Sequence, residues 1–230
     1  MNIYRLAKKD ELSEIAELFT ESFMEYPLFP FILASGKDYK NQLYQLNYTN
    51  TKSYFQQNSC FVGTLDGVIV SAVLLKKRDE KGPGFFQYLF NGGLALAARI
   101  GLKRIHFILN TLDKMKTACS RYGNESWYVD SFAVAKGHQG KKLGSLLFHE
   151  FIFPFIRSNG GGRITLVTHT ELNRRFYCKN GFEVFDKFSI GSEDSPMPNF
   201  SFQQVIDARG LDTPKRTDGD EFSSHVSKSC

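Results

Sequence analysis

Apolar residues recur along the chain in two patterns, and the elements they predict alternate between strands and helices. Short alternating or continuous apolar runs are typical of strands, whereas apolar residues three and four positions apart are typical of amphipathic helices. Strands are expected at residues 2–6, 59–64, 68–76, 127–135, 164–168, 182–190 and 200–205. A first helix is expected after an N-cap at Asp10, with apolar residues from Leu12 to Phe23 on one face. Further helices are expected at residues 39–55, 85–121, 140–157 and 172–179.

Glycine and proline residues indicate where these elements turn or break. Asp66-Gly67 between two apolar runs predicts a hairpin. The 85–121 segment is expected to break near Asn91-Gly92-Gly93, and the 140–157 helix to kink at Pro154 because proline lacks the backbone N–H. The last two strands are expected to be antiparallel neighbours. This order of elements predicts an α/β fold, with a sheet of mixed direction and helices on both faces.

The composition of the chain changes after residue 207. Residues 1–207 carry all the predicted elements and have the length of one domain. Residues 208–230 are polar and rich in turn-forming residues, which is typical of a tail that is ordered only where it docks on the body. The sequence therefore predicts one globular domain followed by a polar tail.

Charge and cysteine spacing exclude several classes of protein. The net charge is +5 and comes from short basic clusters, not from the broad stripe of a nucleic-acid reader. The four cysteines and five histidines lack metal-ligand or disulfide-framework spacing, and the N-terminal residues do not resemble a secretory signal. The apolar stretch 92–109 is too short, and too interrupted by Arg99, Lys103 and Arg104, to span a membrane. We therefore expect a cytoplasmic monomer or homodimer with no nucleic-acid partner, no membrane partner and no metal.

A glycine-punctuated loop between a predicted strand and a predicted helix is the first candidate for chemistry. In AKGHQGKKLGS, Gly140 and Gly144 allow close approach to the backbone, and the start of the helix exposes unpaired N–H groups. Lys141 and Lys142 add positive charge at the same place. These features predict an anion site. The loop has neither the Walker pattern nor GxGxxG, and by itself it fits an ordinary strand-to-helix turn equally well.

A second motif follows the strand that ends at Thr168, and the two motifs together carry a family resemblance. QGKKLGS resembles motif A of the GNAT superfamily of N-acetyltransferases, and NRRFYCKNGFEV resembles its motif B. The resemblance covers about residues 126–190 and departs at Lys142, which replaces the central glycine of motif A. The residues that fill the characteristic places are Gln139, Gly144, Asn173, Tyr177, Gly181 and Phe182.

The resemblance implies the GNAT fold, with a mixed, mostly antiparallel sheet, and acetyl-CoA as co-substrate. The cofactor would bind between the 127–135 and 164–168 strands, which splay apart in this family. Backbone groups of Phe132, Ala133 and Val134 would hold the pantetheine arm, with the Val134 N–H donating to the thioester oxygen. Asn173 would contact the same arm. The pyrophosphate would be held by Gln139, Gly140, Lys141, Lys142, Leu143, Gly144 and Ser145.

Tyr177 is the candidate catalytic acid. Transfer of an acyl group from a thioester expels a thiolate, and a phenol beside the sulfur can protonate it. The alternative interpretation is a packing tyrosine on a short amphipathic helix. The motif context favours the catalytic role.

Asp130 is the candidate base for the amine substrate, acting through water. Strand alternation is expected to place Tyr128, Asp130, Phe132 and Val134 on one face, and bases of the family lie on this strand. A solvated or salt-bridged aspartate is an equally good interpretation. Three further candidates are Glu21, Glu25 and Glu171.

The leading hypothesis is an N-acetyltransferase that transfers an acetyl group from acetyl-CoA to a primary amine of a small molecule, by direct attack in a ternary complex. By resemblance, the long 85–121 segment fits a subgroup of the family with an enlarged helical substrate lid, and the 22 phenylalanines suit an apolar or aromatic amine. One alternative is acetylation of a protein lysine or N-terminus. The other is a non-catalytic module that senses acyl-CoA.

Overall fold

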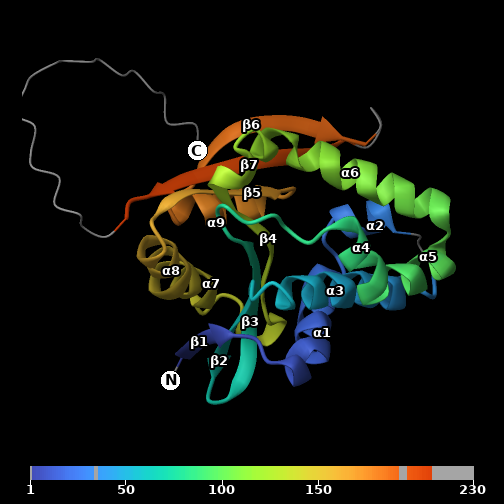
Figure 1. Ribbon diagram of the computed structural model, residues 1–230, viewed down its shortest axis with the longest axis horizontal. Helices are drawn as coiled ribbons and strands as arrows, with labels where there is room; N and C mark the ends of the chain where they lie inside the picture. The colour runs from blue at the N-terminus through green and yellow to red at the C-terminus, as the bar shows by residue number, and fades with distance from the viewer. Residues whose placement is uncertain (1, 34–35, 192–195, 209–230) are drawn as a thin grey trace, which may run out of the picture.

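A computed structural model describes residues 2–33, 36–191 and 196–208, so nearly all of the predicted tail lies outside the described residues. The described residues are built around one seven-stranded sheet in the order β1-β2-β3-β4-β5-β7-β6 (Figure 1). Every neighbouring pair is antiparallel except β4 with β5. The strands are β1 (Asn2–Leu6), β2 (Cys60–Leu65), β3 (Val68–Lys76), β4 (Ser126–Val134), β5 (Gly162–Thr168), β6 (Glu183–Ile190) and β7 (Met197–Ile206).

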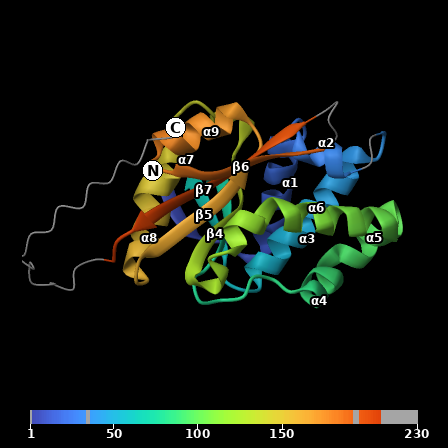
Figure 2. The same cartoon turned by 90° about the horizontal axis from the view of Figure 1, so that it is seen from above.

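Helices cover both faces of this sheet (Figure 2). The helices α7, α8 and α9 pack on one face of the central strands, which we call the α7–α9 side. On the other face pack α1 and α3, and α6 lies against β5 and β7. The helices are α1 (Leu12–Phe23), α2 (Leu28–Ile32), α3 (Tyr39–Phe55), α4 (Phe85–Tyr88), α5 (Leu94–Ile100), α6 (Leu102–Ser120), α7 (Leu143–Leu146), α8 (Phe153–Ser158) and α9 (Glu171–Lys179).

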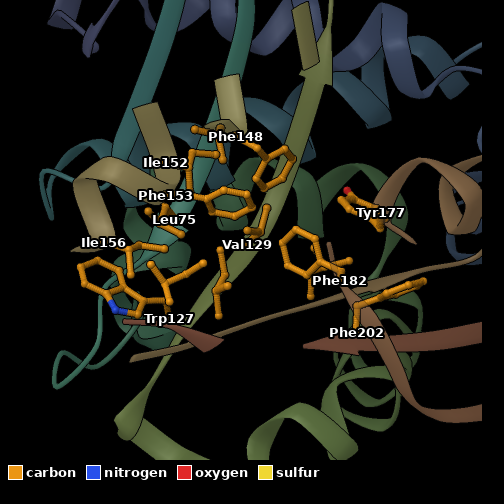
Figure 3. Packing of buried hydrophobic residues seen from close by; sticks show 14 of the residues in the cluster. Leu75, Trp127, Val129, Phe148, Ile152, Phe153, Ile156, Tyr177, Phe182 and Phe202 are labelled. Atoms are coloured by element: carbon orange, nitrogen blue, oxygen red, sulfur yellow. The ribbon is translucent and has the colours of Figure 1, made fainter. Parts of the chain in front are cut away.

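The largest apolar cluster lies between the central strands and the α7–α9 side (Figure 3). Trp127 and Val129 of β4 meet Phe148 and Ile156 of the α7–α8 helix and Phe202 of β7. Each such side chain contributes about 1.5–3 kcal/mol when it is fully buried. This cluster fixes β4 and the α7–α8 helix relative to each other, and both border the predicted cofactor site.

The predicted fold class is confirmed, as is the antiparallel pairing of the last two strands. The predicted hairpin is also confirmed. Asp66 and Gly67 both have positive φ, 51° and 85°, as the tight turn between β2 and β3 requires.

The 85–121 segment breaks at two places, of which the sequence predicts one. Gly92, with φ 142°, interrupts the helical conformation between α4 and α5, where a break is expected. A second break lies at Gly101, with φ 83° and ψ 154°, and separates α5 from α6. Gly101 is flanked by helix-forming residues, so propensity alone does not indicate this corner. No helix among the described residues is both long and apolar enough to cross a membrane.

The helix expected to begin at Gly140 begins at Leu143 and continues through a π-helical stretch, Leu147–Ile152, into α8. Gly140 and Lys142 both have positive φ, which is incompatible with a right-handed helix. The π-helical stretch ends just before Pro154, which cannot donate the usual helical hydrogen bond. The irregularity therefore lies where the proline predicts it.

Candidate active site

The parallel strands β4 and β5 separate in the middle of the sheet. Their last paired residues are Val129 and Leu166. Beyond this pair, β4 continues along β3 to Val134, and β5 continues along β7 to Thr168 (Figure 1). The end of β4 therefore has no strand partner on its β5 side, which is where the sequence predicts the cofactor arm.

The peptide groups at the end of β4 alternate between β3 and the open side. Ala135 N–H donates to Val70 O at 2.9 Å, so Ala135 forms a hydrogen-bonded pair with β3. Every second residue of an antiparallel strand forms such a pair, and Ala133 is the next one. Phe132 and Val134 consequently turn their N–H groups to the open side. Of the three residues predicted to hold the pantetheine arm, these two have peptide groups available for it.

The loop after β4 brings the motif A residues next to this open strand end. Gln139 Nε2 donates to Val134 O at 3.0 Å. Gly140 has φ 77° and Lys142 has φ 63°, a region that glycine enters without cost and lysine does not. Lys142 therefore adopts the backbone conformation that the glycine of motif A is suited to.

The helix that follows the loop begins with unpaired amides. Its first helical hydrogen bond runs from Leu146 N–H to Lys142 O at 3.0 Å. The N–H groups of Leu143, Gly144 and Ser145 consequently have no acceptor within the helix. Lys141 and Lys142 are exposed beside them. These amides and charges suit a phosphate group.

Gly144 has a packing role that the sequence does not predict. A Cβ atom at this position would lie 3.1 Å from the ring of Phe132 and 3.1 Å from the ring of Phe176. These two rings stack on each other with centroids 5.9 Å apart. The missing side chain therefore lets the helix start rest on an aromatic pair that connects β4 to α9.

Tyr177 is a buried residue of α9 with an unpaired hydroxyl. Its ring stands among Phe148, Phe182 and Phe202 (Figure 3), and 7% of the residue is exposed. Among the described residues, its hydroxyl has no hydrogen-bond partner. Burial raises the pKa of Tyr177, so the phenol keeps its proton at neutral pH. The hydroxyl is thus available to donate a proton to a ligand.

A hydrogen-bond network lies at the end of β5. The Tyr26 hydroxyl, from the turn after α1, lies 3.0 Å from Thr168 Oγ1 and 2.9 Å from His169 Nδ1, and it accepts the His169 backbone N–H at 2.9 Å. Asn173 Nδ2 donates to Thr168 Oγ1 at 3.1 Å. Burial lowers the pKa of His169 to about 4, so its ring is neutral at neutral pH.

Asn199 of β7 sets the direction of this network. Its Nδ2 donates to Met115 O at 3.3 Å, so its Oδ1 accepts the His169 Nε2–H at 3.1 Å. The neutral imidazole then presents a lone pair at Nδ1, to which Tyr26 donates. Thr168 accepts from the Asn173 amide, whose carbonyl oxygen is left to accept an N–H from a ligand. The network thereby orients a predicted cofactor residue.

Asp130 is the extra residue of a β-bulge in β4. The β3–β4 register shifts between Leu74 and Leu75, which leaves Asp130 without a residue opposite on β3. The bulge reverses the alternation of side chains, so Phe132 packs in the same cluster as Val129. The expectation that Asp130 and Phe132 share a face is therefore wrong. A bulge is not visible in a sequence that reads as a regular strand.

The Asp130 carboxylate is held by residues of two helices. Lys116 Nζ of α6 lies 2.7 Å from Oδ1, and Asn50 Nδ2 of α3 donates to Oδ2 at 2.7 Å. Ser131 Oγ donates at 3.3 Å, and 8% of the Asp130 side chain is exposed. Burial raises the pKa of Asp130, but the Lys116 charge and these hydrogen bonds outweigh it and leave the pKa below its usual range. This arrangement favours the salt-bridged interpretation.

The remaining base candidates lie on the surface. Glu21 and Glu25 are exposed near the end of α1, and Glu171 is exposed and pairs with Arg174 Nε at 2.7 Å. The sequence does not single out Tyr26 or Asn199 as site residues, and of His169 it shows only that metal-ligand spacing is lacking. Asn199 is the third residue of β7 and lies just before the strand predicted at 200–205, so the sequence carries no clear signal of this buried polar network.

Comparison with known families identifies the motif region. Residues 104–184 match the family described as Acetyltransferase (GNAT) domain. Over these residues the chain is similar to a GNAT acetyltransferase domain. The matched region includes the separated ends of β4 and β5, the 139–145 loop and Tyr177. No curated protein sequence matches the chain significantly.

Solved structures share the fold over most of the chain. An HPA2-related acetyltransferase from Corynebacterium glutamicum is 17% identical, with a TM-score of 0.62 over 92% of this chain and 99% of that one. A mosquito arylalkylamine N-acetyltransferase-like protein is 16% identical, with a TM-score of 0.57 over 90% and 100%. The Salmonella typhimurium protein yncA, determined with acetyl-CoA, is 14% identical, with a TM-score of 0.53 over 94% and 99%. Identities this low show a common fold only.

Proposed function

We propose that the protein transfers an acetyl group from acetyl-CoA to a primary amine of a small molecule, by direct attack in a ternary complex. The separation of β4 from β5 after Val129 and Leu166 carries this proposal. It leaves the amides of Phe132 and Val134 open, beside a helix start with unpaired amides and two exposed lysines. These groups fit the amides and phosphates of the cofactor, and a related fold has been determined with acetyl-CoA bound.

In this proposal the backbone supplies most of the binding. The amides from Gln139 to Ser145, with the Lys141 and Lys142 charges, hold the pyrophosphate. The Asn173 carbonyl oxygen accepts an amide N–H of the pantetheine arm. The Val134 N–H donates to the thioester oxygen, where negative charge develops as the amine attacks.

Tyr177 completes the transfer. As the bond from nitrogen to the acetyl carbon forms and the carbon–sulfur bond breaks, Tyr177 donates its hydroxyl proton to the sulfur. The proton lost by the amine returns to the tyrosine or leaves through water. Asp130 in this account holds the β4 bulge against α3 and α6 and does not act as the base, because its oxygens are engaged by Lys116 and Asn50.

A small amine is the preferred acceptor over a protein. The solved structures that share the fold include an agmatine N-acetyltransferase and an arylalkylamine N-acetyltransferase-like protein. They also include an acetyltransferase related to the histone acetyltransferase HPA2 and a ribosomal-protein-S18-alanine N-acetyltransferase, whose names refer to protein acceptors. The aromatic content of the helices next to the site fits an apolar amine.

The test is release of coenzyme A thiol from acetyl-CoA in the presence of individual amines. We expect release that depends on a small arylalkyl or alkyl amine. Release with lysine peptides or N-terminal peptides alone would support the protein acceptor and contradict this one. Binding of acetyl-CoA by calorimetry without release across the panel would favour the sensor. An absence of binding would contradict all three functions.

A further inference from the structure

One end of the molecule presents large apolar side chains to solvent. Residues 85–109 run through α4, α5 and the start of α6, at the end farthest from α8 (Figures 1 and 2). Seven of the twelve exposed large hydrophobic residues described lie in this segment, so the exposure is concentrated there. They are Phe85, Phe86, Phe90, Leu94, Leu102, Phe107 and Leu109, exposed by 60%, 70%, 73%, 57%, 78%, 37% and 41%. We call Phe85, Phe86, Phe90, Leu94 and Leu102 the apolar end face.

Three polar side chains of α4 and the turn after it, those of Gln87, Tyr88 and Asn91, point inward to α3. Gln87 Nε2 donates to Ser53 O of α3 at 3.0 Å. Asn91 is 6% exposed and donates to Ser53 Oγ at 3.0 Å and to Gln56 Oε1 at 2.8 Å. Tyr88 donates to Asn50 Oδ1 at 3.2 Å. These bonds lock the segment with its apolar side chains outward, because a rotation that buried the phenylalanines would break them.

The charge of the segment has one sign. Arg99, Lys103 and Arg104 lie between residues 85 and 112, where there is no Asp or Glu. Arg99 pairs with Asp38 at 2.9 Å, whereas Lys103 is exposed and Arg104 is partly exposed. Helical segments that combine exposed aromatic and aliphatic residues with lysine and arginine are typical of membrane interfaces.

We propose that the apolar end face docks on the surface of a membrane with anionic headgroups. Phe86 and Phe90 enter the boundary between headgroups and acyl chains, and Lys103 and Arg104 face lipid phosphates. This proposal departs from the expectation of no membrane partner, whose ground was the lack of a spanning helix, because docking on the surface needs no such helix. A second copy of the chain is a poorer occupant, because a two-fold interface on this face would bring like charges together. The proposal is independent of the acetyl transfer.

Co-sedimentation of the full chain with vesicles tests this proposal. We expect binding to vesicles of phosphatidylcholine with phosphatidylglycerol, and much weaker binding to phosphatidylcholine alone or at high salt. Phe86→Ser with Phe90→Ser should weaken binding by about tenfold or more, as should Lys103→Glu with Arg104→Glu. The matched controls are Val68→Ser, an exposed apolar residue on the β2–β3 hairpin, and Lys9→Glu, an exposed lysine near β1. Both should bind as the wild type does.

A Phe90→Trp variant tests insertion separately from charge attraction. Its fluorescence should shift to the blue on addition of anionic vesicles and be quenched by brominated lipid. Three results would overturn the proposal: no sedimentation with anionic vesicles at low salt, binding that the two apolar substitutions leave unchanged, or a wild-type dimer that these substitutions convert to a monomer.

Discussion

The two sides of β4 are built on opposite plans. From β4 to α9, the chain leaves backbone N–H groups open at the ends of separated strands and at a helix start. On the α3–α6 side, polar side chains meet one another, as Asp130 meets Asn50 and Lys116, and the apolar end face points to solvent. The first side binds through its backbone. The second side is a packed scaffold whose polar groups are already used, so we expect substitutions on the two sides to have different consequences.

Proline substitutions at neighbouring positions of β4 give the largest expected contrast. Ala133→Pro removes an N–H paired with β3 and should prevent stable folding, because proline is excluded from central pairing positions. Val134→Pro removes an N–H that faces the open side, so the protein should fold and lose about a hundredfold or more in kcat. Circular dichroism and thiol release measure the two effects. Val134→Ala controls for the side chain, and equal loss of folding in both proline variants would contradict the assignment.

Acid sensitivity of stability separates His169 from the exposed histidines. The folded protein keeps His169 neutral down to about pH 4, whereas an unfolded chain protonates it below about pH 6.5. The unfolded state therefore binds more protons in this window, and stability falls as the pH falls. The expected loss is about 2 kcal/mol between about pH 8 and about pH 5. In denaturant titrations, the free energy of unfolding of His169→Asn should depend less steeply on pH than that of the wild type. His149→Asn should show the wild-type dependence. An unchanged slope in His169→Asn would contradict the buried network.

Tyr177→Phe separates catalysis from packing on the backbone-binding side. The ring keeps its contacts with Phe148, Phe182 and Phe202, and the lost hydroxyl has no hydrogen-bond partner in the part of the chain that the structure describes. We expect kcat to fall about tenfold or more at saturating acetyl-CoA, with little change in Tm. Tyr122→Phe is the control. It removes a hydroxyl that lies away from the site and donates to Gln203 Oε1 at 2.9 Å. Unchanged turnover would refute the acid role.

Asp130→Asn should have the smallest effect on catalysis. The substitution breaks the pair with Lys116, whose side chain is 35% exposed and can turn to solvent, so the cost in stability is about 1 kcal/mol. The basic limb of the pH–rate profile should stay intact, because Asp130 does not remove the amine proton. Loss of that limb, with the fold intact, would restore Asp130 as the base.

The contrast between the two sides of β4 also explains which features could be predicted from the sequence and which could not. The strand ends, the loop and α9 follow from local patterns, because open amides depend on where strands and helices begin and end. Gln139 beside Val134, and Asn173 at the start of α9, lie within short distances along the chain. The fold class and the order of elements were predictable for the same reason.

Partners that are distant in sequence could not be predicted. Asn50 and Asp130 are 80 positions apart, and Tyr26 and His169 are 143 apart. Their meeting depends on the packing of α1, α3 and β5, and the Asp130 bulge shifts the strand faces by one residue. The roles of Asp130 and His169 are therefore visible only once the elements are assembled. The catalytic role of Tyr177 remains a prediction from the motif.

The central claim is that the separated end of β4 and the helix start bind acetyl-CoA through their amides. Titration of ¹⁵N-labelled protein with acetyl-CoA, followed by amide NMR shifts, tests it most directly. We predict large shifts for the amides of Phe132, Val134 and Leu143–Ser145, and a smaller shift for Ala133, whose N–H is paired with β3. Saturable binding with shifts confined to the α3–α6 side, or no binding at all, would contradict the account.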